Sequence, residues 1–197
     1  MHGAGMSVAA HGVGAAYGAA NLAGRAGRML SVGMEFDATM SKVQALARLD
    51  KDSEQMQALR AQAKKLGAET MFSASDAASG QAFLAMAGFT PDAIQAAMPG
   101  LLDMALAGDM ELGRTADIAS NILGGFKLDA SQMGNVADIL TKAFTTSNVS
   151  LEMLGDTMKY VGPVAAAAGM SLEESAAMAG LLGNVGIQSS EAGTTLR

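Results

Sequence analysis

The chain has 197 residues and a formal net charge of −6; half of its residues are hydrophobic, only 4% are aromatic, and it contains no cysteine. The absence of cysteine excludes a disulfide framework, thiolate zinc sites and cysteine nucleophiles. An acidic chain is also poorly suited to binding phosphate backbones, so we expect no sequence-specific nucleic-acid partner. Ala, Met and Leu are good helix formers and strand-favouring residues are scarce, so the composition predicts an all-α fold.

Residues 1–33 are a Gly/Ala-rich arm or linker with two arginines and no acidic residue. The arm is uncharged from residue 3 to residue 24, which is long enough to raise the question of a membrane span. Within it, Gly14 and Gly18 form a small-xxx-small pair of the kind that lets membrane helices approach closely. Glycine disfavours a helix by about 1 kcal/mol relative to alanine. We therefore expect a linker here, and we keep membrane insertion as the alternative.

The remaining residues, 34–197, predict a helical domain that begins with a helical hairpin. Asp52 to Gln55 have the pattern of a capping box, in which Asp52 caps the second helix. Gly67 then provides a permissive C-terminal stop for that helix. Residues on one side of each helix recur at helical spacing: Phe36, Met40, Val43, Ala47 and Asp50 in the first, and Met56, Leu59, Ala63 and Leu66 in the second.

Beyond the hairpin, the sequence predicts a run of short helices, each with its own start signal. Ser73 or Ser75 can cap the first of these helices. Thr90-Pro91 is an N-cap followed by proline at the first helical position. Pro99 is expected to end that helix and to begin another, because proline removes a helical hydrogen bond.

A spacing of 21 residues appears from about residue 108. Gly113, Gly134 and Gly155 fall at this interval, with Ala176 next in line. An apolar residue followed by a capping residue recurs at the same interval: Leu128-Asp129, Val149-Ser150 and Met170-Ser171. A unit of one helix and one turn cannot bury its apolar stripe alone, so successive helices must pack on one another. The sequence therefore predicts a compact array of short helices.

The candidate packing and assembly residues lie on two apolar faces of this array. Each face repeats at helical spacing and is expected to be buried against neighbouring helices or other copies of the chain. The first face contains Met133, Val136 and Leu140, and the second contains Leu151, Leu154 and Met158.

The sequence predicts no catalytic, cofactor-binding or metal-ligating set. Its two histidines, His2 and His11, both lie in the arm. The glycine-rich stretch 12–18 misses the dinucleotide-binding spacing and follows no predicted strand. Glu173 and Glu174 are adjacent at a helix start, where acidic side chains stabilise the helix dipole. We therefore expect neither an enzyme nor a cofactor.

Seven segments of the sequence resemble segments of a known protein family. They are Phe36–Val43, Leu84–Phe89, Thr115–Asn121, Leu154–Val161, Pro163–Ala166, Ser171–Glu174 and Ala192–Arg197. In this order they resemble the core region of phage tail tape-measure proteins, over roughly residues 34–197. The arm at residues 1–33 is similar to the Gly/Ala-rich stretch that often precedes this core.

The resemblance implies a virion structural protein that lies in the lumen of the tail tube and on the baseplate hub after assembly in the bacterial host cytoplasm. Such a protein templates tube polymerisation, sets tail length and leaves ahead of the DNA during ejection. The implied partners are further copies of itself, as a trimer, together with tail tube and baseplate hub proteins. The alternative is a membrane-active module that enters the host inner membrane through residues 1–33. We expect the chain to be a fragment of a longer protein.

Overall fold

The computed structural model describes residue 31 and residues 33–197, and residues 33–47 are helical. The chain divides into two units, residues 1–38 and residues 39–197. In the described part of the first unit, Phe36 is buried. The second unit contains all the helices from residue 54 onward.

Helices account for the regular structure of the second unit, and the described residues contain no strand, which confirms the all-α prediction. The α-helices are short, and a 3₁₀ turn leads into one of them. Their bounds are α2 Glu54–Glu69, α3 Ala74–Met86, α4 Pro91–Ala107, α5 Leu112–Phe126, η1 Ala130–Gln132, α6 Met133–Thr146, α7 Leu151–Ala167, α8 Leu172–Asn184 and α9 Ser189–Leu196.

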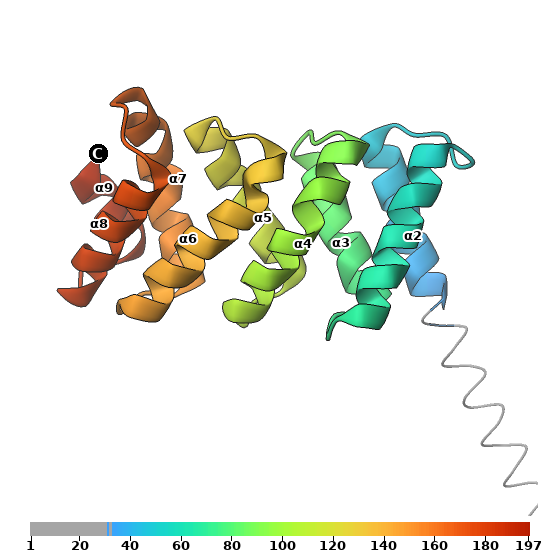
Figure 1. Cartoon of the computed structure of the whole chain (residues 1–197), viewed down its shortest axis with the longest axis horizontal. Coiled ribbons are helices and arrows are strands. Elements are labelled where there is room, and N and C mark those ends of the chain that lie inside the picture. Colours follow the sequence, from blue (N-terminus) through green and yellow to red (C-terminus); the bar gives the residue numbers. More distant parts are fainter. Residues whose placement is uncertain (1–30, 32) are drawn as a thin grey trace, which may run out of the picture. The chain divides into compact units, whose positions relative to one another are not determined.

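The helices of this unit form two layers. α2, α4, α6 and α8 follow one another in the first layer, and α3, α5, α7 and α9 follow one another in the second (Figure 1). Each helix packs against the next helix along the chain and against the next one in its own layer. Contacts therefore run between near neighbours in sequence, as they do in α-solenoids.

The structural repeat is a pair of helices. In the second layer, the N-cap residues Ser73, Glu111, Ser150 and Gln188 follow one another at intervals of 38, 39 and 38 residues. The 21-residue spacing seen in the sequence is the distance from the start of one helix to the start of the next, so it covers one of the two helices of this pair. It holds from α4 to α5 and from α5 to α6, whereas α7 begins 18 residues after α6 because η1 precedes α6.

Most of the predicted helix starts are present. Ser73 caps α3 and forms a capping box with Asp76, and Ser171 forms one with Glu174 at the start of α8. The hydroxyl of Thr90 caps α4, with Pro91 in the first turn as predicted. These side chains satisfy backbone amides that have no partner within the helix.

The predicted cap and stop of α2 are both wrong by a short distance. The cap is Ser53, whose hydroxyl accepts from the amide of Met56, and not Asp52. Gly67 does not end the helix, which continues to Glu69. A Cβ at Gly67 would lie 2.4 Å from the backbone nitrogen of Ala74, so glycine is needed there because the start of α3 passes close to α2.

Pro99 does not break its helix, contrary to the sequence prediction. α4 runs through it without interruption from Pro91 to Ala107. Proline has no amide hydrogen to donate to the carbonyl of the residue four positions earlier, which is Gln95. The side-chain amide of Gln62 in α2 donates to that carbonyl instead, at 2.8 Å. A hydrogen bond between two helices thus satisfies the acceptor that the proline leaves without a partner.

The glycines at the 21-residue spacing lie where helices of one layer approach closely. A Cβ at Gly113 in α5 would lie 2.6 Å from the ring of Phe83, and one at Gly155 in α7 would lie 2.8 Å from Ile118. Gly134 in α6 is the close neighbour of Gly100 in α4, where a Cβ would lie 2.8 Å from the Gly134 backbone. The spacing therefore marks the helix crossings of the array.

Candidate functional site

The predicted packing and assembly residues lie inside the second unit. Each of the six is at most 2% exposed, in helices that pack on both layers. Burial of this kind holds the array together and leaves these side chains no surface at which a partner protein could touch them. The six residues are Met133, Val136 and Leu140 on α6, and Leu151, Leu154 and Met158 on α7.

Exposed apolar side chains are the better candidates for contact with other molecules, and the sequence analysis did not single them out. Leu181 and Val185, at and just beyond the C-terminal end of α8, are 67% and 73% exposed. Apart from Leu172 at the start of the helix, the buried residues of α8 are small and include Ala176, Ala179 and Gly180. A helical wheel of α8 places Leu181 away from this face, and Val185 follows the last residue of the helix.

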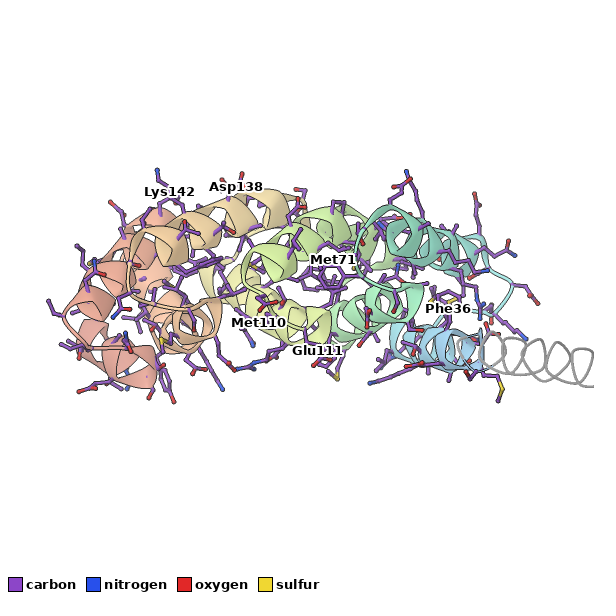
Figure 2. All side chains as sticks on the ribbon, turned by 90° about the horizontal axis from the view of Figure 1, so that it is seen from below. Phe36, Met71, Met110, Glu111, Asp138 and Lys142 are labelled. Atoms are coloured by element: carbon purple, nitrogen blue, oxygen red, sulfur yellow. The ribbon has the colours of Figure 1, made fainter. Side chains whose placement is uncertain are left out.

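A second exposed apolar cluster lies at the turns that precede α3 and α5. Met71 is 77% exposed and Leu106 is 55% exposed. They line a cavity of about 220 Å³ with Phe72 and Met110, and the carboxylates of Asp109 and Glu111 belong to the same lining. Figure 2 looks onto this edge of the unit and labels Met71, Met110 and Glu111.

Charged side chains form one cross-link between neighbouring helices of the second layer. Arg114 in α5 pairs with Asp117 at 2.7 Å in its own helix and with Glu152 of α7 at 3.3 Å. A further carboxylate of α7, that of Asp156, lies 3.8 Å from the guanidinium group. All four side chains are more than 40% exposed, so water screens these pairs and their contribution to stability is small.

Asp129, which precedes η1, is a capping residue with a perturbed pKa. Its carboxylate accepts hydrogen bonds from the hydroxyl and the amide of Ser131, at 2.7 and 2.9 Å. These bonds favour the charged form, and they lower the pKa of Asp129 below the ordinary value. The shift follows from local helix capping, so it does not by itself mark a reactive group.

Other chemistry has little support in the part of the chain that the structure describes. Among those residues, no group of three or more His, Asp or Glu side chains could hold a metal ion. None of the described helices combines the length and hydropathy that a membrane crossing requires. Gly14 and Gly18, the candidate close-packing pair of the arm, lie outside the described residues.

Comparisons with known proteins agree on one family. Residues 60–197 match the family described as phage-related minor tail protein. The chain is 43% identical to the tape measure protein of Pneumococcus phage Dp-1 over 176 residues, which are 89% of this chain and 15% of that protein. It is 40% identical to the probable tape measure protein of Escherichia phage P2 over 191 residues, which are 97% of this chain and 23% of that protein. No solved structure matches the chain. The chain thus spans less than a quarter of either relative.

Proposed function

Because this chain belongs to the phage tail tape-measure proteins, we propose that it is a helical module through which such a protein assembles in the virion tail. The observation that carries this proposal is the match to tape-measure proteins over nearly the whole chain, and the array is compatible with it. Contacts between helices that are close in the sequence join the short helices of the second unit, and several large apolar side chains stay exposed on it. The module acts by shape and burial, without a catalytic step.

The finer role that we propose is that of the whole tape-measure protein. It lies in the lumen of the tail tube and on the baseplate hub, sets tail length as the tube polymerises, and leaves at DNA ejection. Its partners are further copies of itself as a trimer, tail tube proteins and hub proteins, and it assembles in the bacterial host cytoplasm. It recognises no nucleic-acid sequence.

Length argues that this module does not measure the tail by itself. A single α-helix extends about 1.5 Å per residue, so 197 residues could reach about 300 Å at most. The described helices fold back on one another in two layers, which shortens that reach further. The module therefore fits an anchoring role, and the rest of the protein supplies the ruler.

A deletion in a phage tests the role directly. The codons for the module, residues 39–197, are removed in frame from the tape-measure gene, and particles are imaged by electron microscopy. We expect tails to be absent or irregular, because the ruler has lost its anchor. A control deletion of equal length in another part of the same gene should shorten the tails and leave them regular. Regular tails of wild-type length in the module deletion would contradict the proposal.

Release at ejection is a separate part of the proposal. Purified particles are triggered to eject their DNA, and the emptied particles are probed with an antibody against the module. We expect the signal to leave the particles with the DNA, whereas the signal of a tube protein should remain. Retention of the module in emptied particles would contradict release.

The membrane alternative depends on residues 1–33, which are uncharged from residue 3 to residue 24. It predicts leakage of a dye from liposomes of bacterial lipid composition when the whole chain is added. The matched control is the chain without residues 1–33, which should cause no leakage. If both proteins leave the liposomes intact, the alternative fails and the scaffold proposal is unaffected.

A further inference from the structure

The cavity at the turns that precede α3 and α5 combines an exposed apolar lining with acidic side chains. Met71 and Leu106 are largely exposed in this lining, and Phe72 and Met110 are half-buried in it. The cavity lies within the row of helices, with α2 and α3 on one side and α6 and α7 on the other (Figure 1). An exposed apolar patch of this kind on a folded surface is typical of a site that contacts another molecule.

The repeat shows that the fold itself does not require this lining. α5 and α7 begin 39 residues apart, at Leu112 and Leu151. At the same distance, neutral polar residues stand in place of one apolar and two acidic residues of the lining. The replacements are Leu106 by Thr145, Asp109 by Asn148 and Glu111 by Ser150. The apolar and acidic character is therefore particular to the turn before α5.

Negative charge surrounds the apolar lining. Residues 66–113 contain six acidic residues and no lysine or arginine. Two of these acidic residues, Asp109 and Glu111, are exposed and belong to the lining. The first basic residue after them is Arg114, which already lies against three other carboxylates. A molecule that approaches the cavity therefore meets a local excess of negative charge beside the apolar side chains.

Glu111 also departs from the local rule for its position. It is the N-cap residue of α5, but its side chain makes no capping hydrogen bond. At the equivalent position of α7, the hydroxyl of Ser150 accepts from the amide of Met153. A serine would stabilise the start of α5 in the same way. Residues that break a local stability rule in this manner are expected mainly at functional sites.

Size and charge together define what the cavity can take. Pockets for small molecules are typically about 300–1,000 Å³. This cavity of about 220 Å³ is smaller, so it suits a single apolar side chain of a protein segment. Met71 and Met110 are flexible enough to adapt to the shape of such a side chain. The carboxylates favour lysine or arginine beside it, and they repel nucleic-acid phosphates, acidic lipids and the same acidic surface of another copy.

We propose that this cavity binds an apolar side chain of another tail protein, and that a lysine or arginine next to that side chain pairs with Asp109 and Glu111. The inference rests on the proposed assembly in the tail for the origin of the partner, but not on the tail-length role. Binding in solution tests the cavity without a phage, and cross-linking in particles tests the identity of the occupant.

The first experiment selects binders of the cavity from random peptides of about twelve residues. Peptides are selected for binding to the whole chain and against binding to the variant L106T/D109N/E111S. This variant carries the residues of the next repeat, and the new serine can cap α5 as Ser150 caps α7, so circular dichroism should show a folded chain. We expect the selected peptides to carry Leu, Met or Phe within a few residues of Lys or Arg. A selection that yields no peptide, or peptides without basic residues, would overturn the proposal.

Fluorescence polarisation then measures the affinity of the selected peptides. The variant D109N/E111Q should weaken binding roughly 2- to 30-fold, because two exposed ion pairs are lost. Binding to the wild-type chain should also weaken as salt rises from about 20 to about 300 mM, because salt screens exposed charges. The matched control D138N/E173Q removes the same charge from exposed positions elsewhere and should leave the affinity unchanged. Equal affinities of the two double variants would contradict the proposed ion pairs.

The second experiment identifies the occupant in the particle. Met71 is replaced by the photo-reactive residue p-benzoylphenylalanine, and purified particles are irradiated. We expect a cross-link to a different tail protein, at a segment with Lys or Arg within a few residues of the attachment point. The control is the same replacement at Met86, an exposed methionine of α3 outside the cavity, which should give less of this product.

The outcomes of the cross-linking separate the two proposals. With the module detected in the particles, a cross-link at residue 71 to another copy of the tape-measure protein, or none above the control, would overturn the docking proposal. Particles that lack the module would instead contradict the proposed function, and the peptide selection would then decide whether the cavity is a binding site.

Discussion

The close approach of α4 and α6 makes a sharp prediction, because the two glycines at the contact are not equivalent. A Cβ built on Gly100 would lie 2.8 Å from the Cα and the nitrogen of Gly134 and 3.0 Å from the carbonyl carbon of Met133. All three atoms belong to the backbone of α6, so no side-chain rotation can relieve the contact. A Cβ built on Gly134 would have no atom within 4 Å.

The expected magnitudes follow from two opposing effects. Replacing glycine by alanine within a helix stabilises it by up to about 1 kcal/mol. Overpacking a close contact costs typically about 1–3 kcal/mol. Gly100→Ala combines both effects, because the two helices must move apart by about 0.6 Å to reach ordinary contact at 3.4 Å. Gly134→Ala gains the first effect without the second, and so does Gly124→Ala in α5, which also has free space.

The assay is thermal and urea unfolding followed by circular dichroism at 222 nm. Gly100→Ala should be less stable than Gly124→Ala by about 1–3 kcal/mol. For a chain of this size, that difference corresponds to roughly 2–12 °C in Tm. Gly134→Ala should be at least as stable as the wild-type chain. If Gly100→Ala melts at or above the temperature of Gly124→Ala, the α4–α6 crossing is not as close as described and the reasoning is refuted.

Three further predictions concern the core and the caps. Leu154→Asp should unfold the chain, because loss of a buried leucine alone costs about 2–5 kcal/mol and the new charge adds to this. Circular dichroism of Leu154→Asp checks this prediction. The control is Val164→Asp, which changes a partly exposed residue of the same helix and should leave the chain folded. Ser150→Ala removes the hydroxyl that caps α7 and should cost about 1 kcal/mol in urea unfolding, whereas Ser150→Asp should restore the lost stability. Because the folded pKa of Asp129 is lowered, its contribution to stability is present above the pKa of the unfolded chain and is lost as pH falls through the folded value. Ser131→Ala should raise the pKa of Asp129 in an NMR titration, and an unchanged pKa would show that the hydrogen bonds of Ser131 are not its cause.

Local signals in the sequence predicted the helices well. Capping side chains act within a few residues of the chain, so Ser73, Thr90 and Ser171 could be identified without knowledge of the packing. The errors arose where a contact distant in sequence outweighs a local preference. Gly67 serves the approach of α3, and Pro99 is tolerated because Gln62 of another helix donates to the carbonyl of Gln95.

The repeat was found only in part, for a physical reason. The glycines at 21-residue intervals lie at contacts between helices of one layer. A close contact of this kind requires one residue type, so it leaves a visible pattern in the sequence. The full two-helix period depends on the turns, and turns differ in length because η1 adds residues before α6. Side-chain identity therefore repeats over a shorter distance than the structure does.

A comparison of two leucines shows why apolar periodicity alone does not distinguish a buried face from an exposed one. Leu154 and Leu181 are the same residue type on neighbouring helices, but Leu154 is fully buried and Leu181 is largely exposed. The difference lies in the side of the helix that each leucine occupies: Leu154 lies on the side of α7 that packs on the other described helices, whereas Leu181 lies away from the buried side of α8. In an array of this kind, the apolar faces of all helices show the same helical spacing in the sequence. Burial therefore has to come from the packing of the helices in the fold, which the spacing of apolar residues along one helix does not record.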